Sequence, residues 1–381
     1  MTTTTVPNEL RFSILSSVLF KEVASLNRVV SNHAVMPILS NLLLDVRTNE
    51  LTLTASDLNT TAIATLSVTS PGEVRIAVPA TLLLETLRNL PEQPIDIAIN
   101  TSKYNITIKA QNGEYRIACE NAADFPVIPD ITQKEAIQVE VKTLKKAIKK
   151  TVFAAGKDEM RPGLDGVNIT IDEKQATFVA IDGHRLVRYI RHDIHSSTPY
   201  QVTLGVRPLQ LITQLLPDDS QQVMLMISDK YVFFWLGHVQ IITAIIDEDY
   251  PDYENIIPKS SPHKMRISRN KFLNAMKIIA YYANKTTHQI LLYLKQDQLD
   301  LHAEDLQFSN QAHTQLPCQY SGNEYKVGLN ASLALELVNH MPQADIQFLF
   351  DTPKRAIVIE PTEASKEPEE LLMLIMPVAV D

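Results

Sequence analysis

The sequence predicts an α+β protein built from three tandem copies of one domain. Three helix-like segments, VPATLLLETLRNLP, VRPLQLITQLLP and LNASLALELVNHMP, end 126 and 125 residues apart at Pro91, Pro217 and Pro342. Three strand-like runs end in an aspartate at intervals of 125 and 123 residues, at Asp57, Asp182 and Asp305. A third series keeps the same spacing, at Pro126, Pro251 and Pro377. Such regular spacing is typical of repeated domains and favours a repeated binding surface over a single catalytic pocket.

Most of the chain alternates apolar and polar residues, as half-buried strands do. The alternating runs are ELTLTASD, YNITIKAQNGEYRIACE, VNITIDEKQATFVAID, HQILLYLKQDQLDLHAED and AIVIE. Short turns such as Gln111-Asn112-Gly113 interrupt them. The pattern predicts antiparallel hairpins with one face in solvent.

Each copy also carries two helical segments. The first set covers residues 16–29, 142–155 and 268–284, and the second set is the three proline-terminated segments. Hairpins that alternate with two helices predict sheets covering helices in each copy. Pro, Ser and charged residues cluster near 129–134 and 258–263, which places the three domains at 9–130, 135–258 and 263–381.

The composition fits packed domains in a reducing compartment. Of 381 residues, 45% are hydrophobic, enough for several cores. Cys119 and Cys318 lie far apart with no Cys or His at metal spacing, so we expect free thiols and no metal or cofactor. The start MTTTTVPNEL lacks a secretory pattern, and no apolar run reaches the ~18 residues of a membrane span. These features predict a cytoplasmic protein without a membrane partner.

The segment 142–155 separates apolar from basic residues most sharply. At the helical period, Leu144, Ala147, Ile148, Thr151 and Ala155 share one face. The opposite side carries Lys142, Lys145, Lys146, Lys149 and Lys150, with no acid among them. The sequence therefore predicts five lysines facing one way.

Helices at equivalent places in the other copies are also net basic. Residues 268–285 carry Arg269, Lys271, Lys277 and Lys285, and the first helix carries Lys21 and Arg28 against Glu22. A basic helix face is often only a solvated surface. Recurrence within a chain of net charge −9 favours a phosphate-facing surface instead. Because no cluster of base-reading side chains accompanies the lysines, such contact would be sequence-independent and weakened by salt.

No catalytic motif such as a phosphate loop, GxGxxG, HExxH or GxSxG occurs in the sequence. Asp182-Gly183-His184-Arg185 is the one stretch with reactive groups close together. The equivalent turns, SDLNT and EDLQF, supply no partner set, so we interpret it as a turn with His184 and Arg185 exposed at its rim. A hydrolase using Asp182 and His184, and a repeat scaffold that binds only proteins, stay open as alternatives at this point.

Several short segments occur in an order and spacing that match a known family. They are MPILSNLLL (36–44), AADFP (122–126), Arg161 with LDGV (164–167), DGHRL (182–186), YPDY (250–253), YSG (320–322) and MPV (376–378). From about Arg11 to the end, the chain resembles the bacterial sliding clamps, the beta subunits of the replicative DNA polymerase. The resemblance implies three clamp domains per chain and a head-to-tail dimer that forms a closed ring, with helices lining the hole and antiparallel sheets outside.

The resemblance also implies which residues face DNA. Duplex DNA would be held topologically and without sequence specificity. The candidates in this sequence are Lys21, Arg28, His33, Lys142, Lys145, Lys146, Lys149, Lys150, Lys157, Arg207, Arg269, Lys271 and Lys277.

A second implied site is a hydrophobic cleft for short peptide motifs of the polymerase, the clamp loader and repair polymerases. Its matching positions are Leu164, Ile181, Gly183, His184, Arg185, Leu186, Pro251, Ile256, Tyr320, Met376, Pro377 and Val378. Apolar walls with a few polar rim groups suit an extended peptide. The implied dimer interface sets Tyr115 of one copy against Tyr281 and Tyr282 of the other. The Thr-rich start matches nothing in the family, and we expect it to be disordered.

Overall fold

The computed structural model describes residues 9–31, 36–130, 135–157, 160–217 and 221–380. The Thr-rich start and His33 lie outside these ranges. The chain divides into two compact units, which are described one at a time. The first unit holds residues 1–145 and 207–245, and the second holds 146–206 and 246–381.

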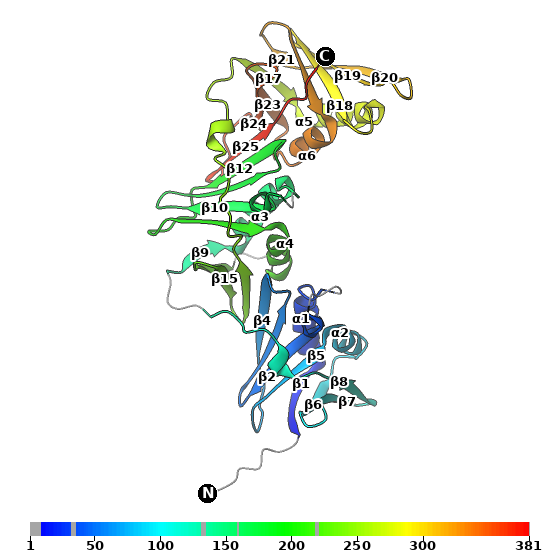
Figure 1. Cartoon of the computed structure of the whole chain (residues 1–381), viewed down its shortest axis with the longest axis vertical. Helices are drawn as coiled ribbons and strands as arrows, with labels where there is room; N and C mark the ends of the chain where they lie inside the picture. Colours follow the sequence, from blue (N-terminus) through cyan, green and yellow to red (C-terminus); the bar gives the residue numbers. More distant parts are fainter. Residues whose placement is uncertain (1–8, 32–35, 131–134, 158–159, 218–220, 381) are drawn as a thin grey trace. The chain divides into compact units, whose positions relative to one another are not determined.

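The elements follow the order strand, helix, four strands, helix, three strands, and this order occurs three times (Figure 1). The first copy contains β1 Leu10–Leu15, α1 Ser16–Leu26, β2 Asn41–Arg47, β3 Glu50–Ser56, β4 Thr60–Ser67, β5 Val74–Pro79, α2 Ala80–Arg88, β6 Pro94–Asn100, β7 Asn105–Ala110 and β8 Gly113–Ala118. Short 3-10 helices, η1 Pro37–Ser40 and η2 Ala122–Asp124, flank its strands.

The second copy repeats the order. It contains β9 Ile137–Glu140, α3 Val141–Thr151, β10 Gly166–Ile171, β11 Ala176–Ile181, β12 Arg185–Arg191, β13 Tyr200–Gly205, α4 Val206–Leu215, β14 Gln222–Ile227, β15 Tyr231–Leu236 and β16 Val239–Ala244. Its 3-10 helices are η3 Val152–Ala154, η4 Pro162–Leu164 and η5 Glu254–Ile256.

The third copy adds one two-residue strand, β21 Gln319–Tyr320, to the same order. Its other elements are β17 His263–Ser268, α5 Arg269–Ile279, η6 Ala280–Tyr282, β18 Gln289–Lys295, β19 Gln298–Asp305, β20 Asn310–Pro317, β22 Tyr325–Asn330, α6 Ala331–Asn339, β23 Asp345–Phe350, β24 Ile357–Pro361 and β25 Glu369–Ile375. The predicted triplication and the two helices per copy are confirmed.

Over the described residues, the strands form four antiparallel sheets, and two of these sheets each join strands of two copies. In the first unit, β4 pairs with β16 inside the order β5-β2-β3-β4-β16-β15-β14-β9. In the second unit, β12 pairs with β25 inside the order β13-β10-β11-β12-β25-β24-β23-β17-β21, and Figure 1 shows these two strands side by side. We call the β4–β16 pair the first seam and the β12–β25 pair the second seam. The remaining sheets are β1-β6-β7-β8 and β20-β19-β18-β22.

The helices bury one face against the sheets, as their apolar spacing predicts. In the first unit, Leu19 and Val23 of α1 and Leu83 and Leu87 of α2 are at most 2% exposed and belong to one core with the strands of the first copy. Leu211 of α4 joins that core. No described helix has both the length and the apolar character that a membrane span requires.

The three aspartates that mark the repeat close hairpin turns. In Asp57, Asp182 and Asp305, the Oδ1 atom accepts backbone N–H bonds from residues two or three positions later, at 2.7–3.1 Å. A carboxylate that mimics a backbone acceptor stabilises a tight turn. The spacing of these residues therefore reports a repeated turn and not a repeated reactive group.

Both cysteines are free thiols, as expected. Cys119 is half-buried and Cys318 is buried. Burial raises the pKa of the Cys119 thiol to about 12 and that of Cys318 to about 11. At neutral pH both stay protonated and therefore weakly nucleophilic.

Candidate functional site

A compact apolar cluster lies next to the second seam, within the second unit. Its buried members are Leu164, Val179, Ile181, Leu186, Ala356 and Leu374. Half-buried side chains pack against them: Tyr250, Tyr253, Ile257, Leu372 and Met376. Four predicted cleft residues, Leu164, Ile181, Leu186 and Met376, thus come together from segments far apart in the sequence. We refer to this set as the apolar cluster.

Backbone hydrogen bonds hold these segments in place. The amide of Gly156 donates to the carbonyls of Leu164 at 2.8 Å and Ile181 at 3.1 Å. At the end of the second seam, the amide of Met376 donates to the carbonyl of His184 at 2.7 Å. The cluster is therefore fixed by main chain from both copies that meet at the seam.

The β11–β12 turn borders the apolar cluster. Gly183 has φ of +88°, a left-handed conformation that favours glycine. His184 is exposed, as predicted. Arg185 is 7% exposed, so the prediction that it lies at the exposed rim is wrong.

Arg185 is buried because three groups hold its guanidinium. Nε donates to Asp182 Oδ2 at 2.9 Å, and the terminal nitrogens donate to Glu336 and to the carbonyl of Phe153. The guanidinium also lies 5.6 Å from the ring centroid of Phe153, within cation–π range. Since both oxygens of Asp182 accept bonds within the turn, this carboxylate is a structural group and not a general base.

The other predicted cleft residues lie outside the apolar cluster. Tyr320 is 2% exposed and donates to the carbonyl of Asn323 at 2.7 Å, and Val378 pairs through its backbone with Gly328. Pro251 and Ile256 are exposed, and Pro377 is half-buried. The sequence prediction omitted the cluster members Val179, Tyr250, Tyr253, Ile257, Ala356, Leu372 and Leu374. Of these residues, the sequence analysis had singled out only Tyr250 and Tyr253, which belong to the YPDY motif.

The basic helix α3 exposes fewer lysines than its periodicity predicts. Lys142 and Lys149 are exposed. Lys145 is 6% exposed and donates to the carbonyl of Leu216 at 2.9 Å, so its predicted place on an open basic face is wrong. Lys150 donates to the carbonyl of His340, and burial lowers the pKa of its ammonium.

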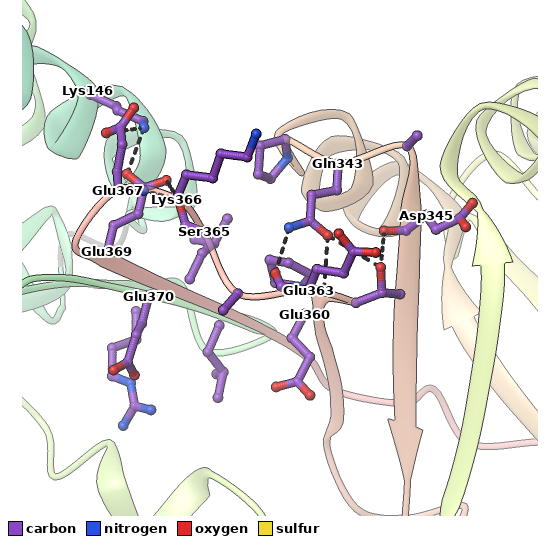
Figure 2. Close-up of a pocket in the computed structure, with 18 of the residues that line it drawn as sticks. Lys146, Gln343, Asp345, Glu360, Glu363, Ser365, Lys366, Glu367, Glu369 and Glu370 are labelled. Carbon is purple, nitrogen blue, oxygen red and sulfur yellow. Dashed lines mark hydrogen bonds and ion pairs between the residues drawn. The ribbon is translucent and has the colours of Figure 1, made fainter.

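Lys146 is bound to an acidic loop of the last copy, residues 362–368, and to the strand that follows it (Figure 2). Its Nζ lies 2.8 Å from Glu367 and 2.6 Å from Glu369. Arg191 of β12 contacts the same two carboxylates at 2.9 Å each. Residues of the loop, together with Lys146 and Glu369, line a pocket of about 770 Å³. Arg191 also binds Asp193 at 2.6 Å, so two cations meet three carboxylates here. Lys146 therefore adds little positive charge to the α3 surface.

Several other predicted basic residues bind carbonyls at helix C-termini. Arg269 donates to Val338 and Asn339 at the end of α6, at 3.0 and 2.8 Å. Arg28 donates to Gln214 in α4 at 3.0 Å. Cations are favourable at helix C-termini, where carbonyls lack intrahelical partners.

Arg207 pairs with Asp57 at 3.1 Å. The exposed lysines among the candidates are Lys21, Lys142, Lys149, Lys157, Lys271 and Lys277.

The predicted interface tyrosines are all exposed. Tyr115 on β8 is 40% exposed, Tyr281 is 76% exposed and Tyr282 is 40% exposed. Tyr281 and Tyr282 belong to η6, which lies beside β20. Within the described residues, β8 pairs only with β7 and β20 only with β19, so both are edge strands.

Comparison with known families covers nearly the whole chain. Models of the DNA polymerase III beta subunit match in order: the N-terminal domain at residues 10–129, the central domain at 138–252 and the C-terminal domain at 254–378. The chain belongs to this family. The family is the sliding clamp of DNA replication, a non-catalytic processivity subunit, which sets the hydrolase alternative aside.

Curated relatives named beta sliding clamp align along their full length. The Pseudomonas putida protein is 24% identical over 370 residues, covering 96% of this chain and 100% of the relative. The Bacillus subtilis protein is 23% identical over 381 residues, covering 97% and 99%.

Solved structures share the fold. The Bacillus subtilis sliding clamp superposes with a TM-score of 0.91 at 22% identity, covering 98% of this chain and 100% of that one. The Pseudomonas aeruginosa clamp, solved bound to griselimycin, gives a TM-score of 0.89 at 22% identity, covering 97% and 100%.

Proposed function

We propose that two copies of this chain close into a ring around duplex DNA and tether the replicative polymerase and other proteins with clamp-binding motifs. In this proposal, each copy contributes three domains, 9–130, 135–258 and 263–381. The ring works in the cytoplasm, where a bacterial chromosome is replicated.

The observation that carries the ring is the pair of edge strands. Each internal seam joins the third strand of a four-strand run, which lies at the spatial edge of that run, to the last strand of the next copy, β4 to β16 and β12 to β25. The same rule leaves β20 at one end and β8 at the other. A second molecule can satisfy both edges by the same head-to-tail contact, which closes a ring when the rotation permits.

Exposed aromatic side chains at both edges support that junction. Tyr115 lies on β8, and Tyr281 and Tyr282 lie beside β20. Aromatic residues at the centre of an interface carry much of its binding energy. Replacing both Tyr281 and Tyr282 with Ala should shift the protein toward monomers in analytical ultracentrifugation at low concentration. An unchanged dimer would count against this placement.

The exposed lysines of the helices support a weak, sequence-independent contact with phosphates. A topological tether needs only a mildly attractive lining, and the net charge of −9 disfavours binding of DNA elsewhere on the surface. The decisive experiment loads the protein onto nicked circular DNA. Retention that is lost when the circle is linearised supports encirclement, whereas equal retention on both forms, or none, contradicts it.

Among these lysines, Lys149 gives the sharpest test of the lining. Lys149→Ala should reduce the slope of log affinity against log salt by about 1, since one phosphate contact is lost. Lys174→Ala is the matched control, because Lys174 is exposed in the β10–β11 turn and is not part of a helix.

The apolar cluster is the proposed peptide site. Its aliphatic members suit the apolar anchors of an extended peptide, and the exposed His184 can contact the peptide at the border. That a relative was solved with griselimycin bound supports a ligand-binding surface in the family.

A further inference from the structure

The first seam defines a strand register relative to its hairpin turn. Thr60, the first residue of β4 after the turn, pairs with Thr243 of β16. The residue before it, Asn59, accepts a bond at its carbonyl from the amide of Ala244 at 2.8 Å. Hydrogen bonds alternate along an antiparallel ladder, so Thr60 and Thr243 form a non-hydrogen-bonded pair.

The second seam repeats this arrangement. Arg185, the first residue of β12 after its turn, pairs with Ile375 of β25. The carbonyl of His184, one residue earlier, accepts from the amide of Met376 at 2.7 Å. Both internal junctions therefore begin in the same hydrogen-bonding phase.

The two edge strands correspond in position to the strands of the first seam, although the β19–β20 loop, counted from its turn aspartate, is two residues longer than the β3–β4 loop. Asn310 is the first residue of β20 and pairs across its hairpin with Asp305. Gly113 is the first residue of β8, paired with Ala110, as Val239 is the first of β16, paired with Leu236. In the first seam, Val239 lies opposite Ala64, four residues after Thr60.

We propose that β8 of one copy pairs antiparallel with β20 of a second copy in the register of the first seam. Gly113 then lies opposite Thr314 and Tyr115 opposite Ala312. The inference rests on the proposed ring and adds which residues meet at its junction.

The backbone of β8 is in the right phase for this register. The amide of Cys119 donates to the carbonyl of Tyr104 at 2.8 Å in the β7–β8 ladder. By alternation, the peptide groups of Tyr115 bond to β7, and those of Glu114 and Arg116 point to the free edge. Tyr115 is therefore expected in a non-hydrogen-bonded pair across the junction, as the proposed register requires.

The side-chain faces also agree. Successive residues of a strand point to opposite faces, and a shift of one residue would exchange buried and exposed sides. Tyr115 shares the face of the buried Ile117, and the half-buried residues of β20 are Ala312, Thr314 and Leu316, which share one face of that strand.

On the polar face, the register sets Glu114 opposite His313. His313 already stacks with His302 of β19 at a centroid distance of 5.8 Å. Glu114 lies 3.5 Å from Lys109 and 3.7 Å from Arg116 of its own sheet. The alternative registers, shifted by two residues, would set Glu114 opposite Gln311 or Gln315.

Disulfide cross-linking tests the register, because non-hydrogen-bonded pairs bring Cβ atoms within the reach of an S–S bond. In a Cys119→Ala, Cys318→Ala background, Tyr115→Cys is combined in turn with Ala312→Cys, Asn310→Cys and Thr314→Cys. All three variants share the loss of Tyr115, so each is the control for the others. Under mild oxidation, the Ala312→Cys variant should form at least ten times more covalent dimer than either shifted variant.

The outcomes separate the register from the ring. If the parent protein is dimeric but a shifted variant cross-links best, or none does, the register is overturned and the ring survives. If the parent protein stays monomeric in sedimentation at micromolar concentration, the ring itself fails.

A charge-swap cycle gives a second readout. His313→Glu should weaken dimerisation about tenfold, because like charges then lie opposite each other at both junctions of the ring. Adding Glu114→Lys should restore it. If dimerisation is unchanged in His313→Glu, the proposed pairing is contradicted.

Discussion

The two internal seams begin with the same backbone hydrogen bonding but carry different side chains at three aligned positions. The closing turns align Ser56 with Ile181, because each precedes a turn aspartate. At the second seam, Ile181 belongs to the apolar cluster. At the first seam, Ser56 Oγ forms a hydrogen bond of 2.9 Å with Thr61 Oγ1, and both side chains are buried.

Two further aligned positions are also more apolar or larger at the second seam than at the first. Thr61 of the first seam corresponds to Leu186 of the second, and Ala244 corresponds to Met376, since each donates to the equivalent turn carbonyl. The first seam thus has a satisfied hydroxyl pair where the second has aliphatic walls. The candidate peptide site of the second seam therefore differs from the equivalent place at the first seam in at least three side chains.

The seams also differ at their far ends. The first seam ends at Val239 opposite Ala64, whereas the second continues to Arg191 opposite Glu369. Arg191 is 3% exposed, and Glu369 is 9% exposed and accepts a bond from Tyr189. The second seam is therefore closed by a buried ionic network.

Of the substitutions that distinguish the two seams, removing the Arg191 side chain should lower the free energy of unfolding most. In Arg191→Ala, Glu369 keeps Lys146 at 2.6 Å, but Asp193, Glu367 and Glu369 all lose their guanidinium partner. A hydrogen bond to a charged group contributes about 1.5–3 kcal/mol, so the total loss should be about 3–5 kcal/mol. Urea unfolding should report this loss, and hydrogen exchange should locate it in β25. Arg188→Ala is the control, because the Arg188 pair with Glu254 is partly exposed at 3.3 Å and is worth at most about 1 kcal/mol. Equal losses in the two variants would contradict the role of the network.

The contrast in side chains predicts a difference in stability. Leu186→Ala should cost about 2–5 kcal/mol, because Leu186 is 1% exposed and a cavity would remain. Thr61→Ala, at the equivalent place, should cost about 1 kcal/mol through the lost hydrogen bond to Ser56. Chemical denaturation of both variants measures the difference. A Thr61→Ala loss as large as that of Leu186→Ala would show that the first seam depends on this position as much as the second does.

The fold was predictable from the sequence because local patterns carry it. Period-two alternation predicted the hairpins. The spacing of Asp57, Asp182 and Asp305 predicted the copies, because in each copy the aspartate accepts backbone hydrogen bonds that close the same turn. Helix periodicity predicted a helix over 142–155, and the structure has α3 at Val141–Thr151 followed by the 3-10 helix Val152–Ala154.

The contacts that individual charged side chains make could not be predicted in the same way. Periodicity gives the direction of a side chain on its own helix but not the neighbour that it meets. Lys145 meets the carbonyl of Leu216, 71 residues later, and Lys146 meets Glu367, 221 residues later. Arg185 followed a turn motif and was expected at the rim, yet Glu336, 151 residues away, binds it. Long-range partners of this kind appear only once the chain is folded.

The half-buried Met376 allows a test of binding that leaves the core intact. Met376→Ala should weaken binding of a fluorescent peptide with a clamp-binding motif about tenfold, the loss expected for part of a buried thioether side chain. Fluorescence anisotropy measures the affinity. The converse change at the first seam, Ala244→Met, should leave it unchanged, because the hydroxyl pair of Ser56 and Thr61 remains there. Undiminished affinity in Met376→Ala would separate the apolar cluster from peptide binding.

The smallest expected effect concerns pH and the ionic network of the second seam. Hydrogen bonds from Lys146, then from Arg191, hold the pKa of Glu367 at about 2, below its ordinary value of 4.5. A lowered pKa in the folded state gives stability that is present above about pH 4.5 and is lost as the pH falls toward 2. The Glu367 side chain is 55% exposed, so solvent screening limits the contribution to at most about 1 kcal/mol.

Glu367→Gln removes the titrating group and so isolates this contribution. The variant should melt slightly below the parent protein at pH 7, and the two melting temperatures should converge near pH 2. Glu363→Gln, in the same acidic loop, is the control, because the backbone of Glu363 and not its carboxylate bonds to Gln343. If the difference in melting temperature between the parent protein and Glu367→Gln stays constant from pH 7 to pH 2, the carboxylate acts through its shape and not its charge. The ionic network at the second seam would then depend on the charge of Glu369 and not on that of Glu367.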